Sequence, residues 1–236
     1  DLNFSNGLPM EHPFNQRKNE GGATLTIDNK ELIYTVCEYG TCKENPNYYN
    51  CDLYHSKFEN AYWNEIKPLP GLANMPCSWE SMPSISSDGK VLYFVSDRSG
   101  GYGGYDIYKS IRDENNNWGP AINLGPTINS SGNEKSPFIH TDSQTLYFSS
   151  DGHIGIGGYD IFFSKLNDDG KWTEPKNIGY PINTEYDDIG FFVSTNGKYG
   201  YFASNRIKNL SLGGWDFYSF ELYKDARPEK VLFVKG

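Results

Sequence analysis

Short segments rich in aromatic and β-branched residues recur along the chain, and turn-forming residues separate them. Val91–Ser96 and Thr145–Ser150 are two of these segments. Such runs, bounded by Gly, Asn, Asp or Ser, are typical of β-strands. The pairs Asp88-Gly89 and Asn196-Gly197 favour tight hairpin turns, because both central residues of a type I′ turn have positive φ. The pattern therefore predicts an all-β fold made of antiparallel hairpins.

An aspartate marks the same point in each repeat of this pattern. Asp52, Asp106, Asp160 and Asp216 follow one another at intervals of 54, 54 and 56 residues. Each repeat has one strand before a hairpin turn, one after it, and a third around the aspartate. A tail beginning with Trp follows the first three aspartates, and its proline in two repeats suits an outer edge strand. Four strands per repeat predict a β-propeller of four-stranded antiparallel blades, with four repeats visible.

We expect one propeller domain over residues 1–228, followed by a linker or the start of another domain over 229–236. The repeats are expected at about 16–70, 76–129, 130–183 and 184–223.

The two ends of the repeat array are offset by one strand. Pro13-Phe14-Asn15 matches Pro181-Ile182-Asn183, so residues 2–15 resemble the outer strand of another blade, whereas the last repeat has no such tail. This offset fits a ring of four blades closed by pairing of residues 2–9 with 216–222, which would remove open sheet edges. The alternative is a larger ring of which this chain holds a part.

Composition narrows the classes of partner. Aromatic residues make up 16% of the chain, which also has 25 Gly, so helix has little support. The net charge of −9 is unsuited to nucleic acids or anionic membrane surfaces, which need a clustered basic face. No apolar run approaches the roughly 18 residues of a membrane helix. We therefore expect no nucleic-acid partner and no direct insertion into a membrane.

Four cysteines, Cys37, Cys42, Cys51 and Cys77, all lie in the first third of the chain. They do not form the paired C-x-x-C set of a structural zinc site, and we expect no metal and no cofactor. An even number permits one or two disulfides, which would indicate an oxidising compartment; the alternative is four small buried apolar residues. A Cys37–Cys51 bridge would join the two sides of an insert, and Cys42 and Cys77 would remain as the second pair.

Several motifs resemble a known family. Pro83–Phe94, Ser96-Asp97-Arg98 and Gly103–Tyr108 resemble the WD40-like propeller repeat of the TolB type. Asn133–His140 and Asp188–Ser194 more narrowly resemble the periplasmic propeller of multidomain OmpA-family proteins from Bacteroidetes.

This resemblance implies a periplasmic location in an outer-membrane-associated parent, in some cases a lipoprotein of the type nine secretion and gliding machinery. It implies other envelope proteins as partners. Peptidoglycan binding would belong to a separate OmpA-type domain outside this sequence.

The repeated aspartates Asp52, Asp106, Asp160 and Asp216 have two interpretations. They could form a carboxylate ring for a cation or for acid–base chemistry. Alternatively, each accepts backbone N–H groups of its own glycine turn. We favour the second, because catalytic residues on a repeat scaffold usually occur in one blade and these occur in all.

Residues that depart from the repeat, or that end its strands, form a candidate binding face. Asp97-Arg98 and Asn205-Arg206 follow a strand, where each arginine either pairs with an acid of a neighbouring blade or faces a ligand. His153 replaces the arginine expected after Asp151. Aromatic rings in loops could stack on sugars. The candidate residues are Trp79, Asp97, Arg98, Tyr102, His153, Asn205, Arg206 and Trp215.

Catalysis has no support in the sequence. His12, His55, His140 and His153 occupy dissimilar repeat positions, so neither a metal triad nor a Ser-His-Asp set can be assembled. No helix follows Gly100–Gly104 or Gly155–Gly158, so these are hairpin loops rather than phosphate loops. The leading hypothesis is a non-enzymatic protein-binding or scaffolding module. The alternatives are a small-ligand or glycan-binding propeller and, less favoured, a hydrolase.

Overall fold

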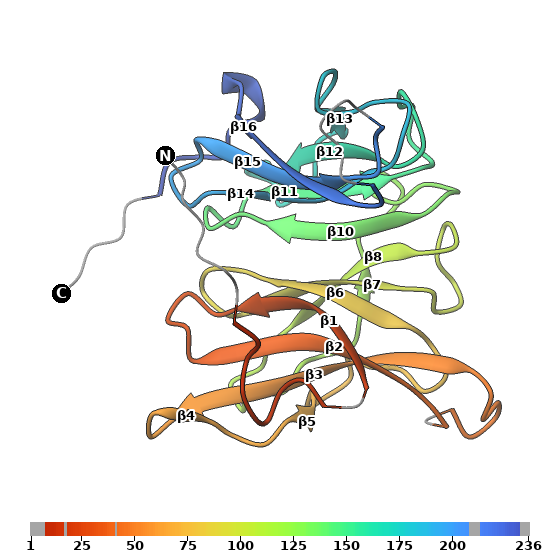
Figure 1. The fold of residues 1–236 in the computed structure, drawn as a ribbon, viewed down its shortest axis with the longest axis vertical. Coiled ribbons are helices and arrows are strands. Elements are labelled where there is room, and N and C mark those ends of the chain that lie inside the picture. Colours follow the sequence, from red (N-terminus) through yellow and green to blue (C-terminus); the bar gives the residue numbers. More distant parts are fainter. Residues whose placement is uncertain (1–7, 17, 41, 208–212, 232–236) are drawn as a thin grey trace.

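Four antiparallel sheets make up the computed structural model of the chain, which describes residues 8–16, 18–40, 42–207 and 213–231 (Figure 1). The sheets are the blades of a β-propeller, so the predicted fold is confirmed. The described residues contain one short 3₁₀ turn, η1 (Lys224–Ala226), and no α-helix. Within that part of the chain, no helix is long and apolar enough to cross a bilayer.

The strands of each blade follow one another from the centre of the propeller outward. Blade 1 contains β1 (Asn19–Leu25), β2 (Glu31–Tyr39) and β3 (Tyr49–Glu59), with β4 (Tyr62–Trp63) and β5 (Lys67–Pro68) both paired to β3. Blade 2 contains β6 (Glu80–Ile85), β7 (Val91–Ser96), β8 (Asp106–Ile111) and β9 (Ile122–Asn123). Blade 3 contains β10 (Glu134–Ile139), β11 (Thr145–Ser150), β12 (Asp160–Lys165) and β13 (Lys176–Asn177). Blade 4 contains β14 (Asp188–Val193), β15 (Tyr199–Ser204) and β16 (Asp216–Glu221).

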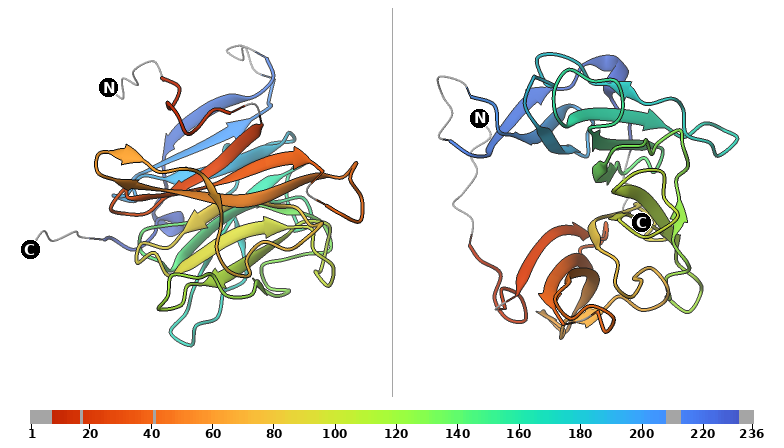
Figure 2. Two further views of the ribbon diagram at one scale, coloured as in Figure 1. Left: turned by 90° about the horizontal axis from the view of Figure 1, so that it is seen from below. Right: turned by 90° about the vertical axis from the view of Figure 1, so that its right-hand side faces the viewer.

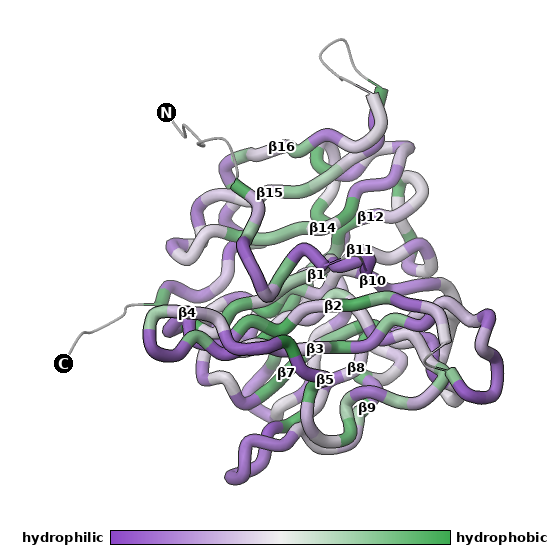
Figure 3. Tube along the Cα trace, turned by 60° about the horizontal axis from the view of Figure 1, so that its bottom comes forward, coloured by the Kyte–Doolittle hydropathy of each residue, from purple (hydrophilic) through white to green (hydrophobic). Residues whose placement is uncertain are grey.

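The hydrophobic core lies between the blades. Side chains of a strand alternate between its two faces, and both faces of the inner blades are apolar. Figure 3 shows apolar residues along the strands and polar residues mainly in the turns. Each blade thus packs on the next through one cluster. Representative pairs are Leu53 and Phe94, Ile107 and Phe148, and Ile161 and Phe202.

The blades follow one another in an arc with blade 1 and blade 4 at its ends (Figure 2). Neighbouring inner strands make contact from β1 to β6, β10 and β14 in turn. The predicted pairing of residues 2–9 with 216–222 lies mostly outside the described residues. Of the part described, Leu8 and Pro9 belong to no strand, and Phe217 of β16 is 83% exposed. Its repeat counterpart Ile107 is fully buried.

Candidate functional site

A β-bulge occurs at the same place in every innermost strand. The register shifts between Gly21 and Ala23, Ser81 and Ser84, Lys135 and Phe138, and Ile189 and Phe192. The residue within each shift has a positive φ: +47° at Gly22, +53° at Met82, +50° at Ser136 and +66° at Gly190. Bulges bend a strand and re-aim its side chains. Four of them at one level therefore shape the centre of the propeller.

The bulged segments line a central channel of about 500 Å³. Its lining consists of Gly22–Leu25, Met82–Ser84, Ser136–Phe138 and Gly190–Phe192, and none of these described residues is ionisable. Phe192 is 43% exposed and stacks on Tyr201, with ring centroids 4.9 Å apart. The channel therefore offers mainly aromatic and aliphatic surface. The N–H groups at two of the bulges are already bonded, that of Met82 to Thr35 Oγ1 at 3.2 Å and that of Ser136 to Met82 Sδ at 3.3 Å.

Sequence reasoning missed these channel residues. A signal existed, since Gly22, Met82-Pro83, Ser136-Pro137 and Gly190 occupy one repeat position. The sequence pattern alone does not reveal that this position faces the centre.

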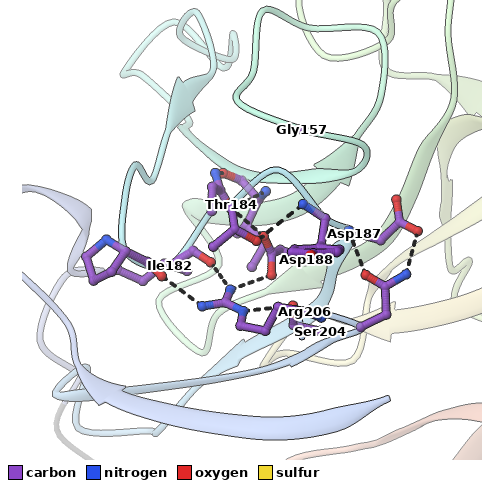
Figure 4. Close-up of polar contacts among 12 residues, drawn as sticks. Gly157, Ile182, Thr184, Asp187, Asp188, Ser204 and Arg206 are labelled. Carbon is purple, nitrogen blue, oxygen red and sulfur yellow. Dashed lines mark hydrogen bonds and ion pairs between the residues drawn. The ribbon is translucent and has the colours of Figure 1, made fainter. Parts of the chain in front are cut away.

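A buried polar network joins the loops at one end of blade 4 (Figure 4). The Asp188 carboxylate accepts hydrogen bonds from the backbone N–H of Thr184 at 2.7 Å and from its hydroxyl at 2.9 Å, and it pairs with Arg206. Arg206 also donates to the carbonyls of Pro181 and Ile182. The guanidinium thus ties the start of blade 4 to the connection that leads into it.

Blade 2 repeats this arrangement. Arg98 Nη2 lies 3.0 Å from Glu80 Oε1 and 2.7 Å from the carbonyl oxygen of Ala73, and its Nε donates to the Ser96 hydroxyl. Both guanidinium groups are enclosed by these partners, so of the two alternatives the arginines pair with an acid rather than face a ligand, and they do not contribute to the candidate binding face. The paired acid also lies in the arginine's own blade and not in a neighbouring one.

His153 takes the corresponding place in blade 3. Its Nε2 lies 2.8 Å from the carbonyl oxygen of Ile128, the repeat counterpart of Ala73 and Ile182. Glu134 is the blade 3 counterpart of Glu80 and Asp188, and its carboxyl group accepts hydrogen bonds from Ser130 and Ser150. No arginine in the described part of the chain pairs with it, and burial raises its pKa. His153 is therefore a structural substitute for the arginine, and its departure from the repeat does not mark a ligand contact.

Asp97 and Asn205 hold the loops that precede the inner strands. Asp97 accepts the backbone N–H of Trp79 at 2.8 Å and the Tyr48 hydroxyl at 3.0 Å. Asn205 exchanges two hydrogen bonds with Asp187, at 2.9 and 3.0 Å.

The same loops join adjacent blades. Asn133 accepts the N–H of Tyr105, and Asp187 accepts that of Tyr159. Of the remaining candidate residues, Trp79 is half-buried against Tyr105, while Tyr102 and Trp215 are 51% and 50% exposed. Only these two retain large accessible rings among the eight proposed for the binding face.

The repeat aspartates lie on the third strand of their blades, two strands away from the channel. A central carboxylate ring is therefore ruled out by their positions. Asp106 accepts the backbone N–H groups of Tyr102 at 2.6 Å and Gly103 at 3.0 Å, and Asp160 accepts those of Ile156 and Gly157. The described residues hold no group of His, Cys, Asp and Glu side chains arranged for a metal ion.

Asp52 differs from this scheme. Asp52 accepts a hydrogen bond from the Asn50 amide at 2.7 Å, and burial and the charge of Glu80 raise its pKa to about 6. Asp216 opens β16 and is half-buried, and part of the loop before it lies outside the described residues.

Two disulfides fix the insert of blade 1. Cys37 on β2 lies opposite Cys51 on β3 and is bonded to it, and Cys42 is bonded to Cys77 in the connection to blade 2. These are the two pairs considered from the sequence. Disulfides of this kind are typical of proteins outside the reducing cytoplasm.

Comparison with known proteins shows which solved structures share this fold. No family model matches the chain, and no curated protein sequence matches it. TolB from Acinetobacter baumannii is similar at a TM-score of 0.53 and 15% identity, over 87% of this chain and 42% of that one. This chain thus spans less than half the length of that TolB.

Two other solved structures are similar over most of this chain. A putative TolB from Agrobacterium tumefaciens has a TM-score of 0.50 at 14% identity, over 90% of this chain and 80% of that one. A puromycin-hydrolysing peptidase from Mycobacterium tuberculosis has a TM-score of 0.50 at 14% identity, over 79% and 28%. The chain therefore has a TolB-like β-propeller fold, and in this chain the propeller has four blades.

Proposed function

We propose that the chain is a non-enzymatic, protein-binding module that docks a segment of a partner protein in its central channel. The observation that carries this proposal is the channel lining, which joins aromatic and aliphatic side chains to bulged backbone and contains no ionisable group among its described residues. Such a surface suits a protein segment whose apolar side chains pack against this lining. The hydroxyl groups of Thr24, Ser84 and Ser136 have no ionisable side chain beside them among the described residues of this lining that could activate them as nucleophiles.

The proposed setting is the periplasm, in an outer-membrane-associated envelope protein. The two disulfides support an oxidising compartment. The resemblance of Asn133–His140 and Asp188–Ser194 to OmpA-family envelope propellers supports the rest of this assignment.

A capture experiment tests the channel. The immobilised chain and its Phe192→Asp variant are exposed to envelope extract from the organism that encodes the chain, with Tyr180→Asp as the control. Tyr180 is 78% exposed and lies outside the channel lining. We expect a partner protein to be retained by the wild type and the control and lost by Phe192→Asp. The purified partner then repeats this order in a binding titration, with thermal melts of all three proteins showing intact folding.

Two results would contradict the proposal. Equal binding of the purified partner to Phe192→Asp would remove the channel from the interaction. Retention of cell-wall fragments with no protein would favour the glycan-binding alternative, for which the exposed rings of Tyr102 and Trp215 offer stacking surfaces.

A further inference from the structure

The last described residues of the chain occupy a slot between blades 3 and 4, at the end of the propeller where the hairpin turns lie. Lys165 Nζ donates to the carbonyl oxygen of Arg227 at 3.0 Å, and the N–H of Glu229 donates to Asp142 Oδ2 at 2.9 Å. Pro228 lies over Gly197, where an added Cβ would come within 3.2 Å of Pro228 Cγ. The protein thus holds an extended segment by one lysine, one aspartate and one glycine.

Blades 1 and 2 present the same three residue types in the corresponding places. Lys57 and Lys165 both stand five residues after the repeat aspartate. Asp28 and Asp142 both begin a hairpin turn, and the Oδ1 of each accepts the backbone N–H two residues later, at 3.0 and 2.9 Å. Gly89 has a φ of +70°, and its counterpart Gly197 has one of +69°.

These three residues, Asp28, Lys57 and Gly89, line a cavity of about 770 Å³. The atoms that bind the segment in blades 3 and 4 have counterparts free to bind here, since neither Asp28 Oδ2 nor Lys57 Nζ has a hydrogen-bond partner or ion pair among the described residues. The position of Tyr147, which bonds Ala226 deep in the other slot, is taken by Ile33. Only the outer part of the slot is therefore reproduced.

Arg112 and Glu31 also line this cavity, and their side chains form an ion pair of 2.6 Å. Arg112 lies over the Trp118 ring, 4.5 Å from its centroid. Beyond this pair, the lining carries five carboxylates and three lysines. The remaining charge is negative, so a segment with a basic side chain is favoured over an acidic one.

We infer that the cavity between blades 1 and 2 binds an extended, basic, proline-containing segment of a partner protein. Asp28 Oδ2 accepts a main-chain N–H of that segment, Lys57 Nζ donates to a main-chain carbonyl, and a proline or other compact residue lies over Gly89. This inference rests on the proposed protein-binding function but assigns a second site, separate from the channel. The occupied slot of blades 3 and 4 shows in the same molecule how such a segment is held.

A labelled peptide with the sequence of residues 224–231, acetylated and amidated at its ends, tests the inference on the whole chain. Binding is followed by fluorescence polarisation, and a benzophenone group at the first peptide position locates the site by cross-linking. We expect saturable binding that weakens about tenfold or more in Lys57→Ala and in Asp28→Asn, since each loses a charge-assisted hydrogen bond. Asp28→Asn keeps the oxygen that accepts the Lys30 N–H, so the turn is preserved.

Lys171→Ala, in an exposed turn of blade 3, is the matched control and should bind as the wild type does. Absence of saturable binding, or equal binding by Lys57→Ala and Asp28→Asn, would overturn the inference. Cross-links to blades 3 and 4 alone would also overturn it, because they would mean exchange with the chain's own segment. The Phe192→Asp variant should bind the peptide normally, so failure here and failure of the channel proposal are distinguishable.

Discussion

Arg206 and Asp188 form a buried ion pair in which the side chains are 3% and 0% exposed. Removing one partner would leave an uncompensated charge inside the protein, which typically costs about 3–5 kcal/mol. We expect Arg206→Ala to lower the free energy of unfolding by that amount in urea titrations. Lys18→Ala breaks the exposed pair with Glu38 and should cost less than about 1 kcal/mol. Equal losses of unfolding free energy in the two variants would show that the buried ion pair of Arg206 does not stabilise the fold more than an exposed pair does.

Asp106 should be essential to the loop that it closes. Asp106→Ala removes the charged acceptor for the part-buried N–H groups of Tyr102 and Gly103, and hydrogen bonds to a charged group contribute about 1.5–3 kcal/mol. We expect a lower thermal midpoint than in Asp168→Ala, whose aspartate lies in an exposed turn. An unchanged midpoint in Asp106→Ala would contradict the structural role of the repeat aspartates.

Asp52 should make the fold less stable as the pH rises. Burial, together with the charge of Glu80, raises its pKa from 3.8 to about 6, so the folded state binds a proton more tightly than the unfolded state does. Its contribution therefore falls as the pH increases from about 4 to about 6. We expect Asp52→Asn to exceed the wild type in unfolding free energy at pH 7 by about 1–3 kcal/mol, with the difference vanishing below pH 4. A difference of the same size at both pH values would contradict this explanation.

The two disulfides should contribute unequally. They close loops with sequence separations of 14 and 35 residues, and a longer loop restricts the unfolded chain more. We expect a loss of about 3 kcal/mol for the Cys37→Ser/Cys51→Ser double variant and about 4 kcal/mol for Cys42→Ser/Cys77→Ser. Thermal unfolding of both variants checks the order, and reductant should lower the wild-type midpoint without further effect on a variant lacking all four cysteines.

Phe217 and Ile107 occupy equivalent repeat positions but differ in exposure. Ile107→Ala should cost about 2–5 kcal/mol, because it removes a side chain buried between blades 2 and 3. Phe217→Ala should change stability by less than about 0.5 kcal/mol. If Phe217→Ala proved as destabilising as Ile107→Ala, the outer face of blade 4 would be covered in solution, as the ring closure predicted from the sequence requires.

The sequence predicted the strands and the blade architecture because both leave a regular mark on it. The repeat of about 54 residues and the hairpin turns at Asp88-Gly89 and Asn196-Gly197 are local patterns. The disulfide pairs could be proposed because Cys37 and Cys51 fall on adjacent strands of a hairpin.

The sites could not be predicted in the same way. The sequence left open whether Arg206 pairs with an acid of a neighbouring blade or faces a ligand, because nothing local joins it to its actual partner Asp188, 18 residues earlier in the same blade. The cavity between blades 1 and 2 is lined by Asp28 and Gly89, which belong to different blades and come together only because the blades pack side by side. The ion pair joins distant parts of one blade and the cavity joins two blades, so neither leaves a local pattern in the sequence.

The bulges in the inner strands bring one equivalent position of every blade to the channel. Met82 and Ser136 sit at points where the sheet register has already been interrupted, and their side chains lie at the channel rather than among the fully buried core residues. Met82 also packs against the core shared by blades 2 and 3, and its Sδ accepts the N–H of Ser136 in the next blade at 3.3 Å. Any change in what the channel accepts at this position is therefore coupled to the fit between two neighbouring blades.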